Sequence, residues 1–374
     1  MVIKSLKTGL AVAISLVVFN WPSALAQGAG SVFESSATCK ECHEDIYRNW
    51  RNSLHALAFT NPIFQTAYNK AYRETKGEAR KYCLGCHAPT VRITGDYDAE
   101  LPITAEGVTC DFCHTVTKID LETPGSPFVS SPGDVKRSVL RQAESPHHKT
   151  EYSSDFASSK LCAGCHSFKN RHGVAVGDTY KEWENSEFAK EGKQCQDCHM
   201  QQIAGRTAIE GGRDKIHDHS LSHNLASMRE AVKLQFMETK STGSRFSAQV
   251  EIHNAKAGHN IPTGTPERHL VLEVQTKDRG GSVIETQKRL YHKTIVNSKG
   301  AEIFSDGDVF LHGVQIVEDN RLRPGEKRLE KFVFSKRVSE ISSVSADIYF
   351  HYEPWVAQKT EMRIPFFSAD VFVK

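Results

Sequence analysis

The second half of the chain shows a two-residue periodicity of hydrophobic and polar positions. From about residue 228, apolar and polar side chains alternate in six short runs, VKLQFME, FSAQVEIH, HLVLEVQT, KRLEKFVFS, SADIYFHYE and RIPFFSADVFV. Such alternation is typical of strands with one buried face. Turn sequences such as Ser-Thr-Gly-Ser and Arg-Pro-Gly-Glu separate the runs, and no extended helical pattern divides them. The pattern predicts an all-β antiparallel sandwich of roughly seven strands over residues 229–374.

The N-terminus has a different pattern, that of an export signal. Lys4 and Lys7 precede the apolar run GLAVAISLVVF, and the small residues of Ser-Ala-Leu-Ala (23–26) follow it. The run is too short for a transmembrane anchor, and a small-residue cleavage site lies at the expected distance. We therefore expect residues 1–26 to be a cleavable signal peptide. The mature protein would then lie in the periplasm without a membrane span.

Charge excludes one broad class of function. The chain has 47 basic and 45 acidic residues, a formal charge of +2. Removal of Lys4 and Lys7 with the signal peptide would bring this charge to zero. A neutral mature chain gives no support to binding of nucleic acid or of an anionic membrane surface.

All ten cysteines occur in one kind of motif. They form five C-x-x-C-H sequences with no cysteine left over, at CKECH (39–43), CLGCH (83–87), CDFCH (110–114), CAGCH (162–166) and CQDCH (195–199). Disulfides do not explain a histidine after every pair, and a zinc ribbon has no use for that histidine. C-x-x-C-H is the attachment signature of c-type haem.

The motifs therefore predict five covalently attached c-type haems. In each motif both sulfurs would bond to the porphyrin, and the histidine that follows would be the proximal iron ligand. The predicted attachment residues are Cys39, Cys42, Cys83, Cys86, Cys110, Cys113, Cys162, Cys165, Cys195 and Cys198, and the predicted proximal ligands are His43, His87, His114, His166 and His199.

Spacing of the motifs predicts the character of the first domain. Five motifs within residues 39–199 leave too few residues per haem for a conventional apolar core. The porphyrins themselves should form the core, wrapped by short helices and irregular segments. We thus predict a mainly α and irregular pentahaem domain over residues 27–228, followed by the β-sandwich of residues 229–374.

The sixth ligand of each iron decides the function. A haem with two histidines transfers electrons, whereas a haem with an open position can bind and convert a small molecule. Of 18 histidines, five are predicted proximal ligands, which leaves thirteen candidates for five distal positions.

One distal candidate follows the first motif and carries a family resemblance. Trp50, Ser53 and His55 form Trp-x-x-Ser-x-His after C-x-x-C-H. This arrangement resembles multihaem cytochromes of the cytochrome c-554/c-prime type, whose wider relatives include hydroxylamine-oxidising and nitrite-reducing enzymes. The resemblance implies that His55 is the distal ligand of a neighbouring haem. A surface histidine on an amphipathic helix is the alternative.

Two further segments resemble elements of the same family. The sequence Ser-Pro-His-His (145–148) offers His147 or His148 as a distal ligand, and we favour His147. The sequence His-Ser-Leu-Ser-His (219–223) resembles a His-x-Phe-x-Gly-x-His element, which implies that His219 and His223 ligate two different haems. A two-histidine metal site is the competing interpretation, but no H-E-x-x-H motif supports it.

The fifth distal candidate lies in the β region. The loop AGHNIPTG (257–264) resembles a segment of family members with a C-terminal β domain, in which Gly-His-x-x-Pro-Thr-Gly places its histidine against a haem. The resemblance implies that His259 is the remaining ligand. A hydrogen-bonded loop histidine is the alternative.

Two functions are compatible with these predictions. We favour an electron-transfer protein with bis-histidine haems and no catalytic residue, acting between a quinol-linked cytochrome and a terminal reductase, as in anaerobic respiration. The alternative is an oxidoreductase that converts a small nitrogen or sulfur compound at one five-coordinate haem. The Cys-x-x-Cys-Lys motif of the nitrite-reducing relatives is absent, because all five motifs end in histidine.

Overall fold

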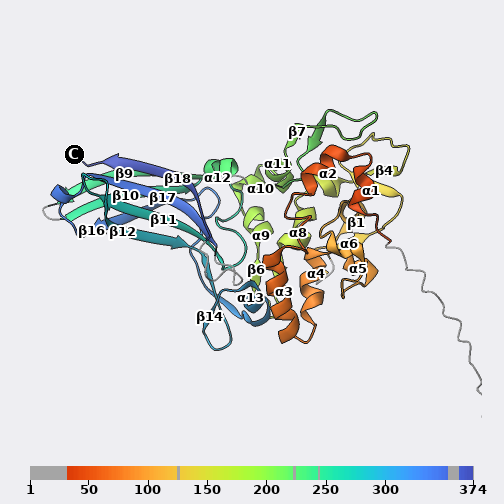
Figure 1. Cartoon of the computed structure of the whole chain (residues 1–374), viewed down its shortest axis with the longest axis horizontal. Helices are drawn as coiled ribbons and strands as arrows, with labels where there is room; N and C mark the ends of the chain where they lie inside the picture. Colours follow the sequence, from red (N-terminus) through yellow and green to blue (C-terminus); the bar gives the residue numbers. More distant parts are fainter. Residues whose placement is uncertain (1–31, 124–126, 222–224, 243–244, 353–361, 374) are drawn as a thin grey trace, which may run out of the picture. The chain divides into compact units, whose positions relative to one another are not determined.

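The computed structural model describes residues 32–123, 127–221, 225–242, 245–352 and 362–373 (Figure 1). The predicted signal peptide and His223 lie outside the described residues. Among the described residues, no helix combines the length and apolar character that are needed to cross a bilayer.

The first part of the chain is built from short helices. All are between four and thirteen residues long: α1 (Ser36–Lys40), α2 (Glu44–Trp50), α3 (Pro62–Glu74), α4 (Ala79–His87), α5 (Val91–Thr94), α6 (Pro102–Ala105), α7 (Cys110–His114), α8 (Lys160–His166), α9 (Thr179–Glu184), α10 (Glu187–Lys190) and α11 (Cys195–His199). The 3-10 turn η1 (Ser154–Ala157) lies before α8. This confirms the predicted helical and irregular first region.

Four small two-stranded sheets connect these helices. Three are antiparallel and one, β3–β4, is parallel; the strands are β1 (Val116–Ile119), β2 (Phe128–Ser130), β3 (Val135–Ser138), β4 (Lys149–Tyr152), β5 (Phe168–Lys169), β6 (Ala175–Gly177), β7 (Gln202–Ala204) and β8 (Lys215–His217). Because each strand has at most four residues, these sheets only link neighbouring segments and do not form a core.

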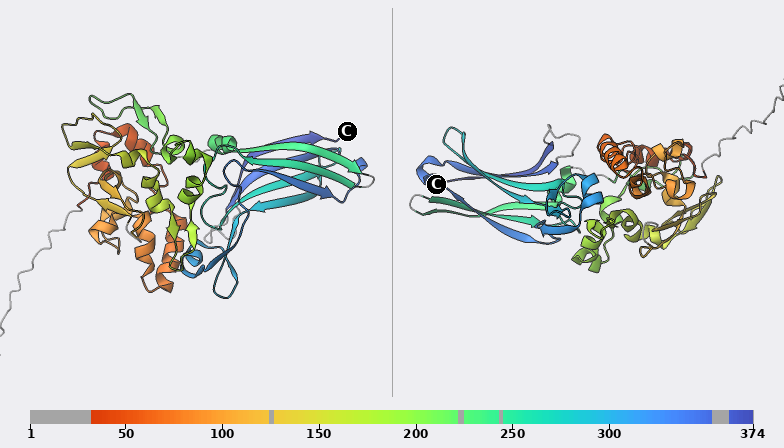
Figure 2. Two further views of the ribbon diagram at one scale, coloured as in Figure 1. Left: turned by 180° about the vertical axis from the view of Figure 1, so that it is seen from behind. Right: turned by 90° about the horizontal axis from the view of Figure 1, so that it is seen from below.

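The second region contains the predicted antiparallel strands. One sheet has the order β16-β10-β9 and the other β12-β11-β17-β18. Their bounds are β9 (Val232–Thr242), β10 (Arg245–Asn254), β11 (Arg268–Lys277), β12 (Val283–Tyr291), β16 (Lys327–Phe334), β17 (Ser343–Tyr352) and β18 (Met362–Phe372). The two layers of long strands are visible in Figure 2. This confirms the all-β second region.

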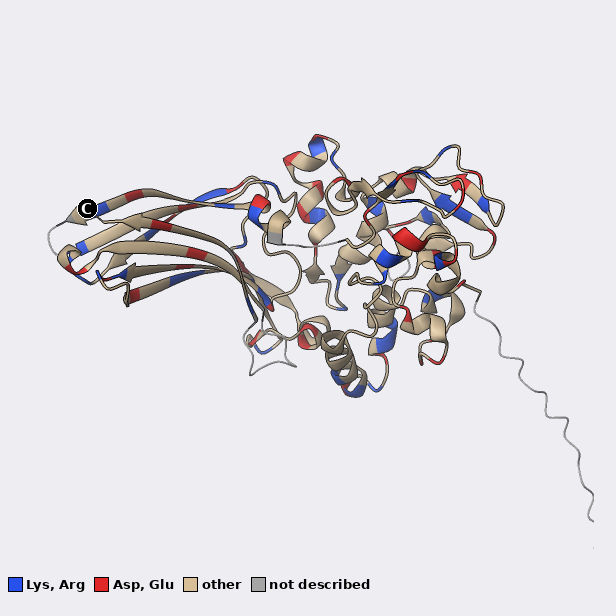
Figure 3. Ribbon diagram, turned by 45° about the horizontal axis from the view of Figure 1, so that its top comes forward, with Lys and Arg blue, Asp and Glu red and all other residues tan. Residues whose placement is uncertain are grey.

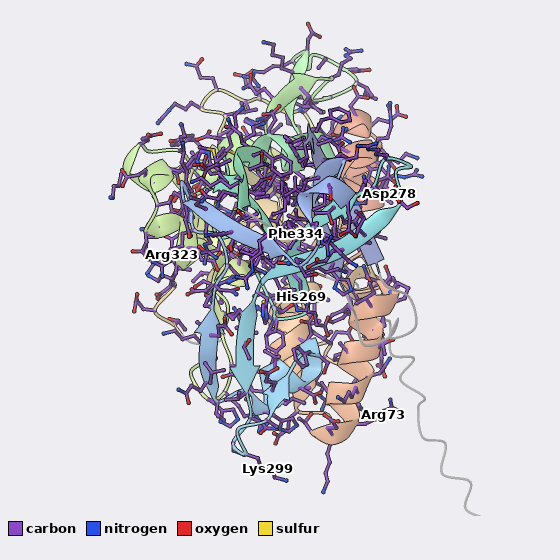
Figure 4. The ribbon with its side chains drawn as sticks, turned by 90° about the vertical axis from the view of Figure 1, so that its left-hand side faces the viewer. Arg73, His269, Asp278, Lys299, Arg323 and Phe334 are labelled. Carbon is purple, nitrogen blue, oxygen red and sulfur yellow. The ribbon has the colours of Figure 1, made fainter. Side chains whose placement is uncertain are left out.

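Alternation along these strands places one side of each in a shared core. On β10 every second residue from Phe246 to Ile252 is fully buried, and on β11 Leu270, Leu272 and Val274 are buried in the same way. Phe332 and Phe334 of β16 join this cluster, and Phe334 lies among the strands in Figure 4. Pairing of hydrophobic faces across two sheets is the usual way a sandwich buries its strands.

Two features of this region did not follow from the pattern. Strand β12 has largely polar residues and was not among the predicted runs. A small three-stranded sheet, β13 (Lys293–Val296), β14 (Glu302–Ile303) and β15 (Gln315–Asp319), interrupts the sandwich together with helix α13 (Asp306–His312). Lys299 lies in the turn between β13 and β14 (Figure 4). The 3-10 turn η2 (Val338–Glu340) precedes β17.

The predicted domain boundary at residue 228 falls within helix α12 (Leu225–Ala231), just before β9. The two-domain division stays a prediction. Acidic and basic residues are interspersed along the helices and strands (Figure 3).

Candidate haem-binding site

One continuous cavity of about 3480 Å³ runs through the helical region. This volume is several times the roughly 300–1,000 Å³ of an ordinary ligand pocket. All ten motif cysteines and all five motif histidines line the cavity. The first region therefore has the space for several large prosthetic groups in mutual contact, as the close spacing of the motifs predicts.

Side-chain caps start three of the five helices that carry the motifs, α1, α7 and α11. The Ser35 side chain accepts a hydrogen bond from the Ala37 amide at the start of α1, and Thr109 accepts one from Phe112 at the start of α7. Gln194 and Asp197 form a reciprocal capping box on α11. These caps satisfy amides that a short helix leaves unpaired. They fix both cysteines of a motif on one helical turn.

Three pairs of histidine rings face each other at nearly the same spacing. The ring centroids of His43 and His148 are 6.2 Å apart, those of His55 and His166 6.3 Å, and those of His199 and His259 6.3 Å. A metal–imidazole bond of about 2.0 Å, with a ring nitrogen about 1.15 Å from its centroid, gives about 6.3 Å for two imidazoles on opposite sides of one ion. The three pairs therefore fit a haem iron between their rings.

Four of the histidines that line the cavity are oriented by a backbone carbonyl. The Nδ1 atom of His87 donates to Ala58 O (2.9 Å), that of His114 to Arg137 O (2.6 Å), that of His259 to Asn260 O (2.9 Å) and that of His43 to Thr207 O. A hydrogen bond at Nδ1 selects the tautomer in which Nε2 carries the lone pair. The arrangement leaves Nε2 available for iron.

His55 owes its position to the residues of its motif. The Trp50 indole donates to Val108 O (2.9 Å), and the Val108 amide donates to His55 O (2.9 Å). The Ser53 hydroxyl accepts from the Ala56 amide (3.1 Å). Trp50 and Ser53 thus tie the turn that carries His55 to the segment before the third haem motif.

Glycine is required at position 107, where the segment before the third haem motif contacts the turn that carries His55. Gly107 has φ of +70°, and a Cβ atom there would lie 2.5 Å from the carbonyl oxygen of His55. Only a residue without a side chain permits this approach. The close contact locks the His55 backbone beside the third motif.

Of the two adjacent histidines, the structure places His148 opposite His43. The His148 ring faces the His43 ring, and its Nδ1 atom donates to Lys149 O (3.1 Å). His147 is exposed, although it also borders the cavity. The geometry therefore favours His148 over our sequence-based choice of His147. The parallel pairing of β4 with β3 fixes the residues next to His148 and decides which of the two rings faces inward.

His219 is a partly buried imidazole beside His114. Burial, and then the neighbouring His114 ring, lower the pKa of His219 to about 4. Its Nδ1 atom donates to His217 O (2.7 Å). Burial, followed by the charge of His87, likewise lowers the pKa of His55 to about 4. Neutral imidazole is the form that binds a metal ion, so both side chains are in the correct protonation state at neutral pH.

His87 lies in an aromatic environment. Its ring stacks on Phe64 with centroids 3.8 Å apart and planes 12° from parallel. Burial is the main cause that lowers the pKa of His87. The predicted ligand His223 lies outside the described residues, so the structure describes no pairing for it.

Cysteines from different motifs contact each other. The thiols of Cys39 and Cys110 are hydrogen-bonded, as are those of Cys86 and Cys165, and those of Cys162 and Cys195. These thiols stand in for the thioether sulfurs of the haem-bound protein. Sulfur atoms in contact mean that the attachment sites are immediate neighbours. The second and fifth motifs both contact the fourth, and the first contacts the third.

Close packing also fixes the fourth motif against the rest of the site. Gly164, between its two cysteines, would place a Cβ atom 2.1 Å from the ring of Phe128. Phe128 packs with Phe112 of the third motif at a centroid distance of 5.4 Å. This packing places the third and fourth motifs side by side, and the neighbouring Cys113 contributes to raising the pKa of both Cys162 and Cys165.

Five C-x-x-C-H motifs around one cavity, with histidine pairs spaced for iron, define a multihaem c-type cytochrome. Residues 38–115 match the family described as "Cytochrome c554 and c-prime". The family resemblance that Trp50, Ser53 and His55 carry is therefore confirmed.

A solved structure has the same fold. The "penta-heme cytochrome c552 from Thermochromatium tepidum" superposes with a TM-score of 0.73 and 22% sequence identity, over 92% of this chain and 100% of that one. A β-glucuronidase from Bacteroides uniformis and a β-glucosidase from Kluyveromyces marxianus match over 38% of this chain, both with a TM-score of 0.19, which is too low to carry an argument. No curated protein matches the chain.

Proposed function

We propose that this protein is a periplasmic pentahaem cytochrome that transfers electrons between redox partners through bis-histidine haems. The observation that carries the proposal is the common centroid spacing of 6.2–6.3 Å in three histidine pairs, each containing one motif histidine. An iron with two imidazole ligands has no open position for a substrate. Bound haem iron supplies the one-electron redox chemistry, and the chain tunes it through ligands, hydrogen bonds and burial.

Ring spacing supports three of the proposed ligand sets. We assign His43 with His148, His166 with His55, and His199 with His259. His114 takes His219, its electrostatic neighbour. His87 and His223 remain, and we pair them by elimination.

The sulfur contacts support an order of attachment sites. The first motif adjoins the third, the third adjoins the fourth, and the fourth adjoins both the second and the fifth. The five sites would then form a branched array with the fourth motif at the junction. A branched array has three ends, so it can accept electrons at one site and deliver them at another.

Location and partners complete the proposal. Covalent c-type haem and the predicted signal peptide both favour the periplasm. The partners would be other redox proteins, such as a quinol-linked cytochrome on one side and a terminal reductase on the other. The alternative, an oxidoreductase for a small nitrogen or sulfur compound, requires one haem with an open position. The haem of His87 is the one at which to look for an open position, because its proposed partner, His223, is assigned by elimination.

Protein-film voltammetry of the haem-loaded protein tests the proposal. A haem assay should give five haems per chain, and the voltammogram should show reversible waves that integrate to five electrons. Hydroxylamine, nitrite, nitric oxide and sulfite should each leave the waves unchanged. A catalytic current with any of them would contradict the electron-transfer function and support the alternative.

A further inference from the structure

A buried ion pair joins helix α9 to the segment that supports the His259 loop. The Arg321 Nη1 atom lies 2.7 Å from the Glu182 Oε1 atom, and the two side chains are 5% and 6% exposed. A charge buried without a partner is strongly unfavourable, so each of these groups holds the other in place. The two residues are 139 positions apart, and their contact ties the helical region to the β region.

The second carboxylate oxygen of Glu182 binds the loop itself. Glu182 Oε2 accepts hydrogen bonds from the Asn260 amide (3.1 Å) and from the Thr263 hydroxyl (2.7 Å). Asn260 directly follows His259, and its carbonyl oxygen accepts the Nδ1 proton of His259. One buried carboxylate therefore holds the backbone of Asn260, the residue whose carbonyl oxygen orients the His259 ring.

Arg321 completes the attachment from the opposite side of the loop. Its guanidinium donates to Pro262 O (3.3 Å) and forms a two-point interaction with Asp319, at 2.7 Å and 2.6 Å. Burial opposes the charge of Arg321, but Asp319 and Glu182 outweigh it and raise the pKa of the guanidinium. Arg321 is therefore a fixed cation between two carboxylates.

The backbone of the loop is held as well. Ile261 and Leu322 exchange two backbone hydrogen bonds of 2.9 and 3.0 Å. The fully buried Asn254 donates from its side chain to His259 O (2.9 Å). A Cβ atom on Gly258 would lie 3.2 Å from Trp183, so the loop also packs closely on α9.

A hydrogen bond ties helix α9 to the segment just before the fifth haem motif. The Trp183 indole donates to Lys193 O (2.9 Å), two residues before Cys195. Glu182 thus sits on the segment that positions His199, while it holds the loop that carries His259. The His199 and His259 rings are 17° from parallel, compared with 40° and 36° for the other two pairs.

We propose that Glu182 and Arg321 are positioning residues that hold His259 opposite His199 and keep the two imidazole planes nearly parallel. The inference rests on the proposed function, because it takes His259 as an iron ligand. The ion pair would act through the loop and would not touch the iron or its ligands directly.

Electron paramagnetic resonance (EPR) of the oxidised, haem-loaded protein provides the test. The angle between two axial imidazole planes sets the g values of a low-spin ferric haem. In Glu182→Gln, which loses the charge at unchanged size, we expect the low-spin signal of one haem in five to shift its g values or to be replaced by a high-spin signal. If the signal becomes high spin, carbon monoxide should bind one more ferrous haem per chain than in the parent protein.

Thr263→Val is the second test, because Glu182→Gln could impair folding. It removes the hydroxyl that donates to Glu182 while it keeps the shape of the side chain. A smaller change in the same EPR component is expected. The matched control is Glu273→Gln, which removes a buried carboxylate that pairs with Lys288 and Arg363 in the β region. That control should leave all haem signals unchanged.

His259→Ala separates failure of this inference from failure of the proposed function. If His259→Ala creates one high-spin haem while both Glu182→Gln and Thr263→Val leave the spectrum unchanged, the positioning role is overturned and the ligand assignment stands. If His259→Ala leaves the spectrum unchanged, His259 is not a ligand and both are overturned. Equal spectral changes in Glu182→Gln and Glu273→Gln would also overturn the positioning role.

Discussion

The imidazole rings of His199 and His259 face each other at 6.3 Å across the boundary between the helical and β regions. One belongs to the last C-x-x-C-H motif, and the other to a loop between strands β10 and β11. The β region therefore contributes directly to the cavity of the helical region. This relationship links a loop residue between two alternating β runs to the proposed electron-transfer function.

The adjacent histidines His147 and His148 should differ sharply on substitution. His148→Ala should convert one haem from low spin to high spin, because only the His148 ring faces His43. His147→Ala, the matched control, should leave the visible and EPR spectra of the oxidised protein unchanged. The reverse result would restore the sequence-based choice of His147.

Substitution of His55, the proposed second ligand of the fourth-motif haem, should change the reduction potential of that haem. In His55→Met the thioether would face His166 in place of an imidazole, and methionine ligation raises the reduction potential of a haem. One component of a spectroelectrochemical titration should shift to higher potential, with the absorption band of methionine–iron coordination.

His172→Met is the control for this substitution. His172 uses its Nε2 atom to donate to Leu311 O (3.1 Å), an interaction that does not leave Nε2 available for iron. Its titration should superpose on that of the parent protein. A potential shift in His172→Met, or none in His55→Met, would argue against the assignment of His55.

Sequence reasoning was most specific where chemistry fixes spacing. The C-x-x-C-H motifs and the Trp50–Ser53–His55 element carry a family resemblance that is confirmed. The attachment sites and the ligand position that they indicate stay predictions, which rest on distances set by covalent attachment and by a single turn. The alternating runs predicted six of the sandwich strands, because a two-residue period is what a strand with one buried face requires. Strand β12 was missed because its exposed edge position allows polar residues along most of its length.

The remaining features depend on contacts that are distant in sequence. Which of His147 and His148 lies opposite His43 depends on how the chain enters β4, which pairs with β3. No sequence pattern indicates the ion pair between Glu182 and Arg321, because a glutamate in a charged helix and an arginine after a strand are both common. Loop 257–264 suggested a rigid histidine, but not the carboxylate that holds it.

Lys293 predicts a pH dependence of stability. Burial, and then the neighbouring Arg321 charge, lower the pKa of Lys293 from 10.5 to about 8. Between pH 8 and 10.5 the unfolded chain therefore binds a proton that the folded protein does not, so stability rises with pH over this range. Below pH 8 the full cost of the buried charge is present.

Lys293→Met isolates this contribution. The difference in unfolding free energy between parent and variant should change by roughly 3 kcal/mol in favour of the parent between pH 8 and 10.5. Guanidinium titrations followed by circular dichroism at both pH values would measure it. Parallel pH profiles of the two proteins would show that Lys293 titrates normally in the fold.

A core substitution in the sandwich should cost stability. Leu272 is fully buried in the β core, and Leu272→Ala should lower the free energy of unfolding by about 2–5 kcal/mol. The haem spectra at neutral pH should stay unchanged, because Leu272 does not line the haem cavity. Thermal unfolding monitored in the far ultraviolet gives the stability, and loss of a low-spin haem signal under native conditions would contradict the prediction.

EPR spin quantification of the fully oxidised, haem-loaded parent protein tests the central claim most directly. The account predicts only low-spin ferric signals that sum to five haems per chain, with no change on addition of cyanide or nitric oxide. A high-spin ferric signal that accounts for one haem and disappears on ligand binding would contradict the closed bis-histidine array.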